Sequence, residues 1–220
     1  SKEFKKLESF KKLYIFQTIS RSIILRSLVN YKNFLYLPRE YRMGLVRCGI
    51  YSNNIYLDFG SKLAGNVHQE FFLDIDFMKK IDWANFLGKV CSQWLKQESG
   101  KELKDFKIIN SWIVRQFKNE YNPAHFHSGH ISGVGYLKIP DNLGLTLQNN
   151  KQINQNGRLE LIEGSPKLLS KGNYIIQPKV GDFYLFPAYL LHTVYPFTDS
   201  KDERRSVSFN AAIDSSAASL

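Results

Sequence analysis

The hydrophobic and polar positions divide the chain into an N-terminal part with helical spacing and a C-terminal part with the alternation of strands. In residues 3–30, apolar side chains recur every three to five positions with Lys and Arg between them, and neither Gly nor Pro interrupts the stretch. This spacing predicts an amphipathic helix. Residues 74–97 show a similar stripe, which predicts a second helix that is capped by Asp76 and ends near Gly100.

The texture changes after residue 106. Residues 107–117 are rich in β-branched and aromatic side chains, which are typical of strands. About eight short strands are expected here, and one earlier strand is expected over residues 55–59. Residues 145–156 are expected to form a surface loop and residues 215–220 a loose tail. The other predicted strands are residues 125–127, 133–139, 157–162, 174–178, 181–186, 192–196 and 204–213.

Helices followed by many short antiparallel strands predict an α+β fold, with a double-stranded β-helix (a jelly-roll, cupin-like core) and N-terminal supporting helices. We expect a single domain over residues 1–220. Within it, residues 1–100 would form a mainly helical, basic support region, and residues 107–213 the jelly-roll catalytic core.

Composition adds limits to this picture. The chain has 220 residues of which 43% are hydrophobic, enough for one sizeable core and too many for wholesale disorder. No apolar run is long enough to predict a membrane-spanning helix. Cys48 and Cys91 lie far apart in no metal or redox spacing, which predicts reduced thiols in a cytoplasmic protein.

The net charge of +10 is concentrated near the start of the chain. The first 50 residues contain eleven Lys and Arg against three Glu. Such a region could be a solvated helix face, or pack on the body of the protein or on a second copy in a homodimer. It could also bind an acidic protein, nucleic acid or an anionic surface. The sequence leaves these alternatives open.

Three histidines are placed where they could hold one metal ion. His125 and His127 are two residues apart on a predicted strand, so their side chains point to the same face about 7 Å apart. His192 begins another strand further along the chain. Imidazole groups suit iron, zinc, copper and nickel, and three of them leave coordination positions open for a substrate.

A second pattern predicts an anion-binding group beside the metal. On the strand over residues 204–213, alternation places Arg204, Ser206 and Ser208 on one face and Arg205 on the other. A guanidinium with a nearby hydroxyl can hold a carboxylate through charge-assisted hydrogen bonds, and Tyr136 could add another. The spacing to Ser206 favours Arg204 over Arg205 as the anion-binding residue, although the strand register decides which one faces inward.

Taken in order, these elements resemble the iron(II)- and 2-oxoglutarate-dependent oxygenases, most closely the prolyl-hydroxylase-like branch of short bacterial and phage proteins. The resemblance covers about half of the chain. It rests on Ser111-Trp112, His125-x-His127, Ser132 to Leu137, the Gly181, Pro187 and His192 set, and Arg204-x-Ser206-x-Ser208-Phe209-Asn210.

The resemblance implies iron(II) and 2-oxoglutarate as cofactor and cosubstrate, with O2 as the oxidant. His125 and His192 would be ligands, and His127 stands where the wider superfamily has an aspartate. Arg204, helped by Ser206 and Tyr136, would bind the far carboxylate of 2-oxoglutarate. The implied reaction is a hydroxylation coupled to decarboxylation of 2-oxoglutarate, on an unidentified substrate such as a prolyl side chain of a protein.

Two other functions compete with this interpretation. A cupin-type enzyme with three histidine ligands would also use His125, His127 and His192, but it gives no reason for Arg204-x-Ser206. A non-catalytic binding module on the same fold would be expected to lose site residues, which are all present here.

Several single residues have more than one interpretation. His130 is expected to line the mouth of the site, with a ligand role as the alternative, and His68 is expected at the surface. Trp112 is expected in the core. Arg115 or Gln116 could touch a substrate or the cosubstrate, and Tyr121 could gate the mouth.

Overall fold

The computed structural model describes residues 59–146, 148, 150–165 and 171–218. The predicted helix over residues 3–30 and nearly all of the predicted strand over residues 55–59 lie outside these ranges. The same holds for the basic segment of residues 1–50 and for the last two residues of the predicted tail.

Two helices occupy the segment for which one was predicted. Helix α4 (Ile75–Lys80) has Asp74 as its N-cap, whose side chain accepts a hydrogen bond from the Phe77 amide at 2.8 Å, so the expectation of Asp76 as the cap was wrong. Helix α4 ends at Lys80 with Ile81 as its C-cap. The next residue, Asp82, takes a left-handed backbone conformation with φ of 55°, and α5 (Trp83–Ser99) starts after it. Helix α5 ends at Gly100, as predicted.

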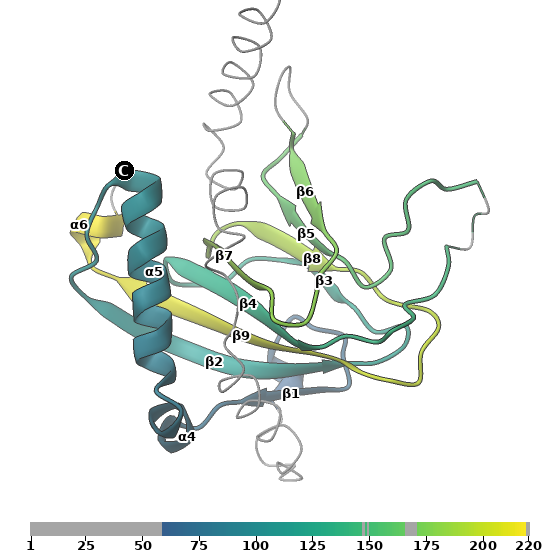
Figure 1. Ribbon diagram of the computed structural model, residues 1–220, viewed down its shortest axis with the longest axis horizontal. Helices are drawn as coiled ribbons and strands as arrows, with labels where there is room; N and C mark the ends of the chain where they lie inside the picture. The colour runs from purple at the N-terminus through teal and green to yellow at the C-terminus, as the bar shows by residue number, and fades with distance from the viewer. Residues whose placement is uncertain (1–58, 147, 149, 166–170, 219–220) are drawn as a thin grey trace, which may run out of the picture.

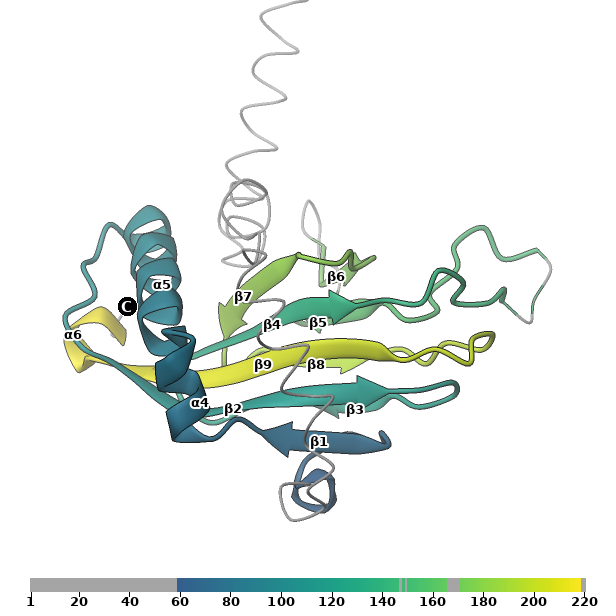
Figure 2. The ribbon, with the colours of Figure 1, turned by 60° about the horizontal axis from the view of Figure 1, so that its bottom comes forward.

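The strands form two antiparallel sheets that face one another (Figures 1 and 2). In spatial order, the larger sheet consists of β1 (Gln69–Phe72), β2 (Phe106–Gln116), β9 (Arg204–Ile213), β4 (Ile131–Lys138) and β7 (Phe183–Pro187). The smaller sheet consists of β3 (Asn122–His125), β8 (Leu191–Val194), β5 (Leu159–Ile162) and β6 (Asn173–Ile176). This arrangement is a double-stranded β-helix, as the sequence predicted.

Short elements complete the described part of the chain. A 3-10 turn, η2 (Gly60–Lys62), precedes β1, and the four-residue helix α6 (Ser215–Ala218) follows β9 where a loose tail was expected. Strand β1 was missed, because its four residues show too little alternation to stand out. Among the described residues of the predicted 145–156 loop there is no helix or strand.

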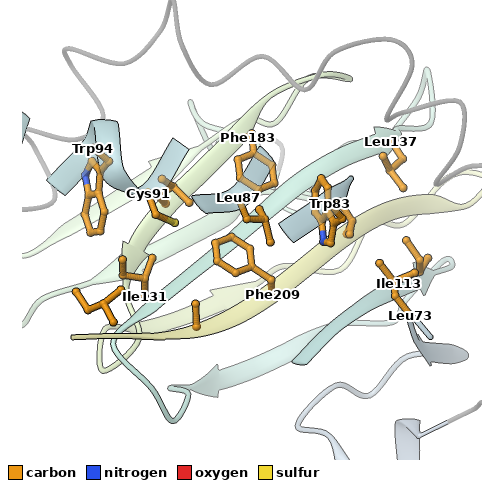
Figure 3. Packing of buried hydrophobic residues seen from close by; sticks show 14 of the residues in the cluster. Leu73, Trp83, Leu87, Cys91, Trp94, Ile113, Ile131, Leu137, Phe183 and Phe209 are labelled. Atoms are coloured by element: carbon orange, nitrogen blue, oxygen red, sulfur yellow. The ribbon is translucent and has the colours of Figure 1, made fainter. Parts of the chain in front are cut away.

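The main hydrophobic core lies between α5 and the outer face of the larger sheet. In Figure 3, side chains of α5 lie over apolar side chains of the sheet. The Trp83 indole N–H also donates to Ser111 Oγ at 3.1 Å, which fixes the start of α5 on β2. The helix contributes Trp83, Leu87, Cys91 and Trp94, and the sheet contributes Ile113, Ile131, Phe183, Val207 and Phe209.

Two glycines of β4 let the large rings of this core approach the sheet. A Cβ on Gly133 would come within 2.5 Å of Phe209, and one on Gly135 within 2.5 Å of Phe183. The rings of Phe183 and Phe209 are stacked with centroids 6.0 Å apart. The core therefore packs on the outer face of β4, and the inner face of β4 points toward the site.

Candidate metal and cosubstrate site

The site lies between the two sheets, and the register of the larger sheet orders its residues in rows. Around the central strand β9, Gln116 pairs with Arg204, Trp112 pairs with Ser208, and Asn110 pairs with Asn210. A cavity of about 310 Å³ is lined by this inner face and by the three histidines. All six predicted site residues line it: His125, His127, Tyr136, His192, Arg204 and Ser206.

The three histidines are neighbours on the paired strands β3 and β8 and on the segment that follows β3. His125 pairs with His192 in the ladder, and the chain beyond β3 brings His127 beside both. Their possible ligand atoms lie within 4.8 Å of one another, with ring centroids 4.2 to 4.9 Å apart. The cluster that these histidines form in the described part of the chain contains no carboxylate.

Backbone carbonyls orient two of the rings. Nδ1 of His125 lies 2.7 Å from the Pro123 carbonyl oxygen, and Nδ1 of His192 lies 2.9 Å from that of Leu190. A carbonyl only accepts, so each Nδ1 carries the proton and each Nε2 keeps a lone pair. A carbonyl on the second ring nitrogen is the arrangement that metal-binding histidines usually have.

Burial keeps these imidazoles neutral. Burial first, and the charge of His125 second, lowers the pKa of His127 to about 4. The same two causes lower the pKa of His192 to about 3, and burial lowers the pKa of His125. Near neutral pH all three rings therefore have a lone pair available, which fits a divalent cation.

Arg204 is a buried cation with no carboxylate partner among the described residues. It is 3% exposed, and its Nη1 donates to the Gln116 side-chain oxygen at 2.8 Å. Its Nε has no hydrogen-bond partner, and its guanidinium carbon lies 5.1 Å from the centre of the Tyr136 ring. Burial lowers the pKa of Arg204, but a guanidinium stays protonated in proteins, so this charge calls for an anionic ligand in the cavity.

The Tyr136 hydroxyl lies at the same end of the cavity. Tyr136 is fully buried, and its hydroxyl has no hydrogen-bond partner. Burial raises the pKa of this phenol, against the opposing charge of Arg204, so the group keeps its proton and can donate. Ser206 pairs with Tyr136 between β9 and β4, so it belongs to the same row.

Arg205 is used differently. It lies on the outer face and is 4% exposed, but its guanidinium is paired with Glu203, which also binds Arg115. Arg115 in turn donates to Gln69. Arg115 and Arg205 do not line the cavity, which leaves Arg204 as the arginine that does.

Some single-residue expectations change. Trp112 is buried, but it lines the cavity with its ring centroid 5.5 Å from that of His127, so it is not simply a core residue. His130 does not line the cavity, because its Nδ1 accepts a hydrogen bond from the Ile213 amide. His68 is at the surface, as expected. Tyr121 forms a bridge with Asn66 and does not line the cavity.

Gln116 was considered only for a contact with substrate or cosubstrate, and a group at the other end of the cavity had no predicted role. Gln116 is buried and holds Arg204, while its own amide donates to the Glu120 carbonyl at 2.5 Å. Asn110, Ser132 and Asn210 form the row farthest from Arg204. The signal available in the sequence was strand alternation, since Asn210 lies on the same face of its strand as Arg204.

Comparison with known proteins finds a family that matches the region of the site. Fold and site define a double-stranded β-helix protein with a candidate metal centre next to a candidate anion site. The 2OG-Fe(II) oxygenase family model (2OG-FeII_Oxy_5) matches residues 110–210, the stretch that contains all six residues. Over this stretch, just under half of the 220 residues, the protein matches this family of iron(II)- and 2-oxoglutarate-dependent enzymes.

Solved structures show the same fold at low sequence identity. A Pseudomonas putida prolyl-4-hydroxylase aligns with a TM-score of 0.53 and 15% identity over 81% of this chain and 88% of its own. A viral collagen prolyl hydroxylase from Paramecium Bursaria Chlorella virus-1 aligns at 0.50 and 14% over 83% and 98%. A Trichoplax adhaerens prolyl hydroxylase, in complex with a hypoxia inducible factor peptide fragment, aligns at 0.51 and 12% over 93% and 94%. No curated protein matches the chain in sequence.

No helix in the described ranges is long and apolar enough to cross a membrane.

Proposed function

We propose that His125, His127 and His192 hold the iron(II) of this oxygenase and that Arg204 binds the far carboxylate of 2-oxoglutarate. The observation that carries the proposal is the buried Arg204, which shares a cavity with the three histidines and has no carboxylate partner among the described residues. The iron would supply the redox chemistry that couples decarboxylation of 2-oxoglutarate to oxidation of the primary substrate by O2.

The residues of the chain orient the cosubstrate. Arg204 supplies the charge and the Nε donor, and Tyr136 supplies a hydroxyl that keeps its proton. Ser206 lies in the same row and adds a hydroxyl. Gln116 holds the guanidinium in position from behind, so the carboxylate is met by donors that are already arranged.

The histidines bind metal without first losing a proton near neutral pH, because their pKa values are lowered. His127 takes the place of the carboxylate that is usual in this superfamily. With three neutral ligands, the site has one negative charge less than a site with two histidines and a carboxylate. We therefore expect weaker retention of iron(II) when the cosubstrate is absent.

An anaerobic titration tests this assignment. Iron(II) is added to the apo protein with and without 2-oxoglutarate, and the visible charge-transfer band of the iron–2-oxoglutarate chelate is recorded. We expect a band that requires both components and is lost in His192→Ala, while the surface variant His68→Ala keeps it. Full iron stoichiometry in His192→Ala would contradict the ligand set.

The alternative of a cupin-type enzyme with three histidines makes a different prediction. Such an enzyme would bind metal without responding to 2-oxoglutarate, and it would leave Arg204 without a ligand. A non-catalytic module would bind no metal. The same titration separates the three functions.

We also propose a protein as the primary substrate, with a prolyl side chain as the first candidate. Support comes from the shared fold with the prolyl hydroxylases, one of which was solved with a peptide. The excess of Lys and Arg in residues 1–50 would favour an acidic protein.

We also propose an intracellular location, because the two cysteines are widely separated in the sequence.

Mass spectrometry tests the substrate class. Proline-containing peptides of graded acidity are incubated with the enzyme, iron(II), 2-oxoglutarate and O2. We expect a mass increase of one oxygen atom that depends on 2-oxoglutarate and is absent in Arg204→Ala. Salt-sensitive binding to a polynucleotide, without peptide oxidation, would shift the substrate class to nucleic acid.

A further inference from the structure

We infer that Asn110 and Asn210 form a subsite that binds a planar amide group of the primary substrate. The inference rests on the proposed function, because it assigns the cosubstrate to the other end of the same cavity. Asn110 and Asn210 are direct partners in the β2–β9 ladder, and both line the cavity. Residues in this relation have Cβ atoms about 5 Å apart, close enough for both to contact one small group.

The pair lies at the end of the cavity away from Arg204. Arg204 and Asn210 are six residues apart on β9, which separates their Cα atoms by about 20 Å along the strand. The row of Asn210 continues through Ser132 to Phe186, whose ring centroid lies 4.9 Å from that of His192. A cosubstrate that extends from Arg204 to the histidines therefore does not occupy the Asn110–Asn210 row.

Asn110 presents an unused acceptor. Its Oδ1 is buried and has no hydrogen-bond partner. A buried acceptor without a partner costs about 1–3 kcal/mol, so such atoms are rare unless a ligand or ordered water meets them. A group that donates a hydrogen bond is expected here.

Asn210 presents the opposite function. It is 3% exposed, and its Oδ1 accepts a hydrogen bond from Ser132 Oγ at 2.6 Å. Ser132 is itself 1% exposed, so this bond fixes the orientation of the amide. The Nδ2 group of Asn210 is the half of the amide that remains for a ligand.

An acceptor beside a donor matches the N–H and C=O of an amide. A carboxylate would meet the unpaired oxygen of Asn110, and an ammonium group would meet the N–H of Asn210, so both charged groups are disfavoured. A site built to hydrogen-bond a ligand group rejects analogues that lack it, which makes the pair a specificity determinant rather than a catalytic group.

The test uses small amides and side-chain NMR signals of the full chain loaded with Zn(II) and 2-oxoglutarate. The Asn110 and Asn210 Nδ2 cross-peaks are assigned by their loss in Asn110→Asp and Asn210→Asp. N-methylacetamide probes a backbone-like amide and acetamide a side-chain amide. Methyl acetate, which keeps the acceptor but lacks the N–H, is the matched control ligand.

We expect the amides to cause saturable shifts of both cross-peaks. Methyl acetate should bind about fivefold more weakly, since one hydrogen bond is lost. Asn110→Leu should weaken amide binding by a similar factor, and the exposed Asn150→Leu should not. If Asn110→Leu does not fold, Asn110→Asp replaces it, with binding retained because the acceptor is kept. A stronger response to N-methylacetamide would indicate a backbone amide, and one to acetamide a side-chain amide.

Equal shifts with methyl acetate and N-methylacetamide, or no saturable shift, would overturn the subsite and leave water or packing as the role of the pair. The 2-oxoglutarate affinity of each sample is measured in parallel. Failure of 2-oxoglutarate binding with an intact amide response would refute the proposed function alone, and the reverse result would refute the subsite alone.

Discussion

Each face of β9 presents one buried arginine, and the two arginines have different partners. The inner face presents Arg204 to the cavity, and the outer face presents Arg205 to Glu203. Both arginines are almost fully buried, at 3% and 4% exposure. The difference lies in the partner, because the protein neutralises Arg205 by itself and leaves Arg204 without a carboxylate among the described residues. Burial alone therefore does not mark a functional charge, whereas burial without a counter-charge does.

The comparison extends along the strand. Beyond Arg205, the outer face consists of Val207, Phe209 and Ala211, which belong to the core under α5. Beyond Arg204, the inner face consists of Ser206, Ser208 and Asn210, which line the cavity. Substitutions on the outer face should therefore change the free energy of unfolding, and those on the inner face the affinity for ligands.

The largest effect is expected from Phe209→Ala. Its ring is fully buried and stacked on Phe183, so truncation leaves a cavity and should lower the free energy of unfolding by about 3–5 kcal/mol. Urea unfolding measures the change. Ser208→Ala, one residue away on the inner face, is the matched control and should stay within about 1 kcal/mol of the wild type. Equal losses of unfolding free energy in the two variants would contradict the assignment of the outer face to stability and the inner face to ligand binding.

Arg204→Ala should raise the dissociation constant of 2-oxoglutarate about 100-fold, because the proposed charge-assisted hydrogen bonds to the far carboxylate would be lost. Iron binding should be retained. Isothermal titration with the anaerobic iron protein gives both quantities. Arg205→Ala should change the 2-oxoglutarate constant by less than about threefold, since its guanidinium is on the outer face. The opposite ranking of the two variants would move the anion site to Arg205.

Gly135→Ala tests the packing that gives β4 its two faces. The new methyl group would come within 2.5 Å of the Phe183 ring, so overpacking should cost about 1–3 kcal/mol in the free energy of unfolding. Phe183→Leu should reduce this cost when the two changes are combined, which a double-mutant cycle measures. A cost that is unchanged in the double variant would point to backbone strain instead of the ring.

The smallest effect is expected from Ser206→Ala. In the proposed site the hydroxyl would add one hydrogen bond to a carboxylate held mainly by Arg204, so the dissociation constant of 2-oxoglutarate should rise about fivefold. The free energy of unfolding should change little. Titration calorimetry on the same iron protein measures the first quantity. A constant equal to that of the wild type would remove Ser206 from the cosubstrate site.

Strand alternation predicted much of this arrangement. It placed Arg204 and Ser206 on one face of their strand and Arg205 on the other, because side chains of a strand point to opposite sides with a period of two. The fold class followed from the order of helices and strands. Boundaries set by single backbone angles did not follow, as the break at Asp82 shows.

Other features depended on tertiary contacts. The position of Trp112 beside His127 comes from packing between the two sheets, and no local pattern distinguishes it from a core residue. His130 lies near the site in sequence, but it is held by the amide of Ile213 at the end of β9. Gln116 acquires its role only when β2 and β9 pair, since that pairing sets it beside Arg204.

The placement of β3 has a consequence for local opening. This strand is at the end of the smaller sheet and is joined to β8 through two ladder pairs, Asn122 with Val194 and His125 with His192, whereas β9 is paired on both sides. Edge segments with few pairs open at lower free energy than central strands. Amide hydrogen exchange over residues 122–127 should therefore be fast in the apo protein and slower after metal is added. The amides of β9 should be protected from exchange in both states. In this enzyme the metal would therefore hold the edge strand β3 to β8, in addition to its part in the reaction.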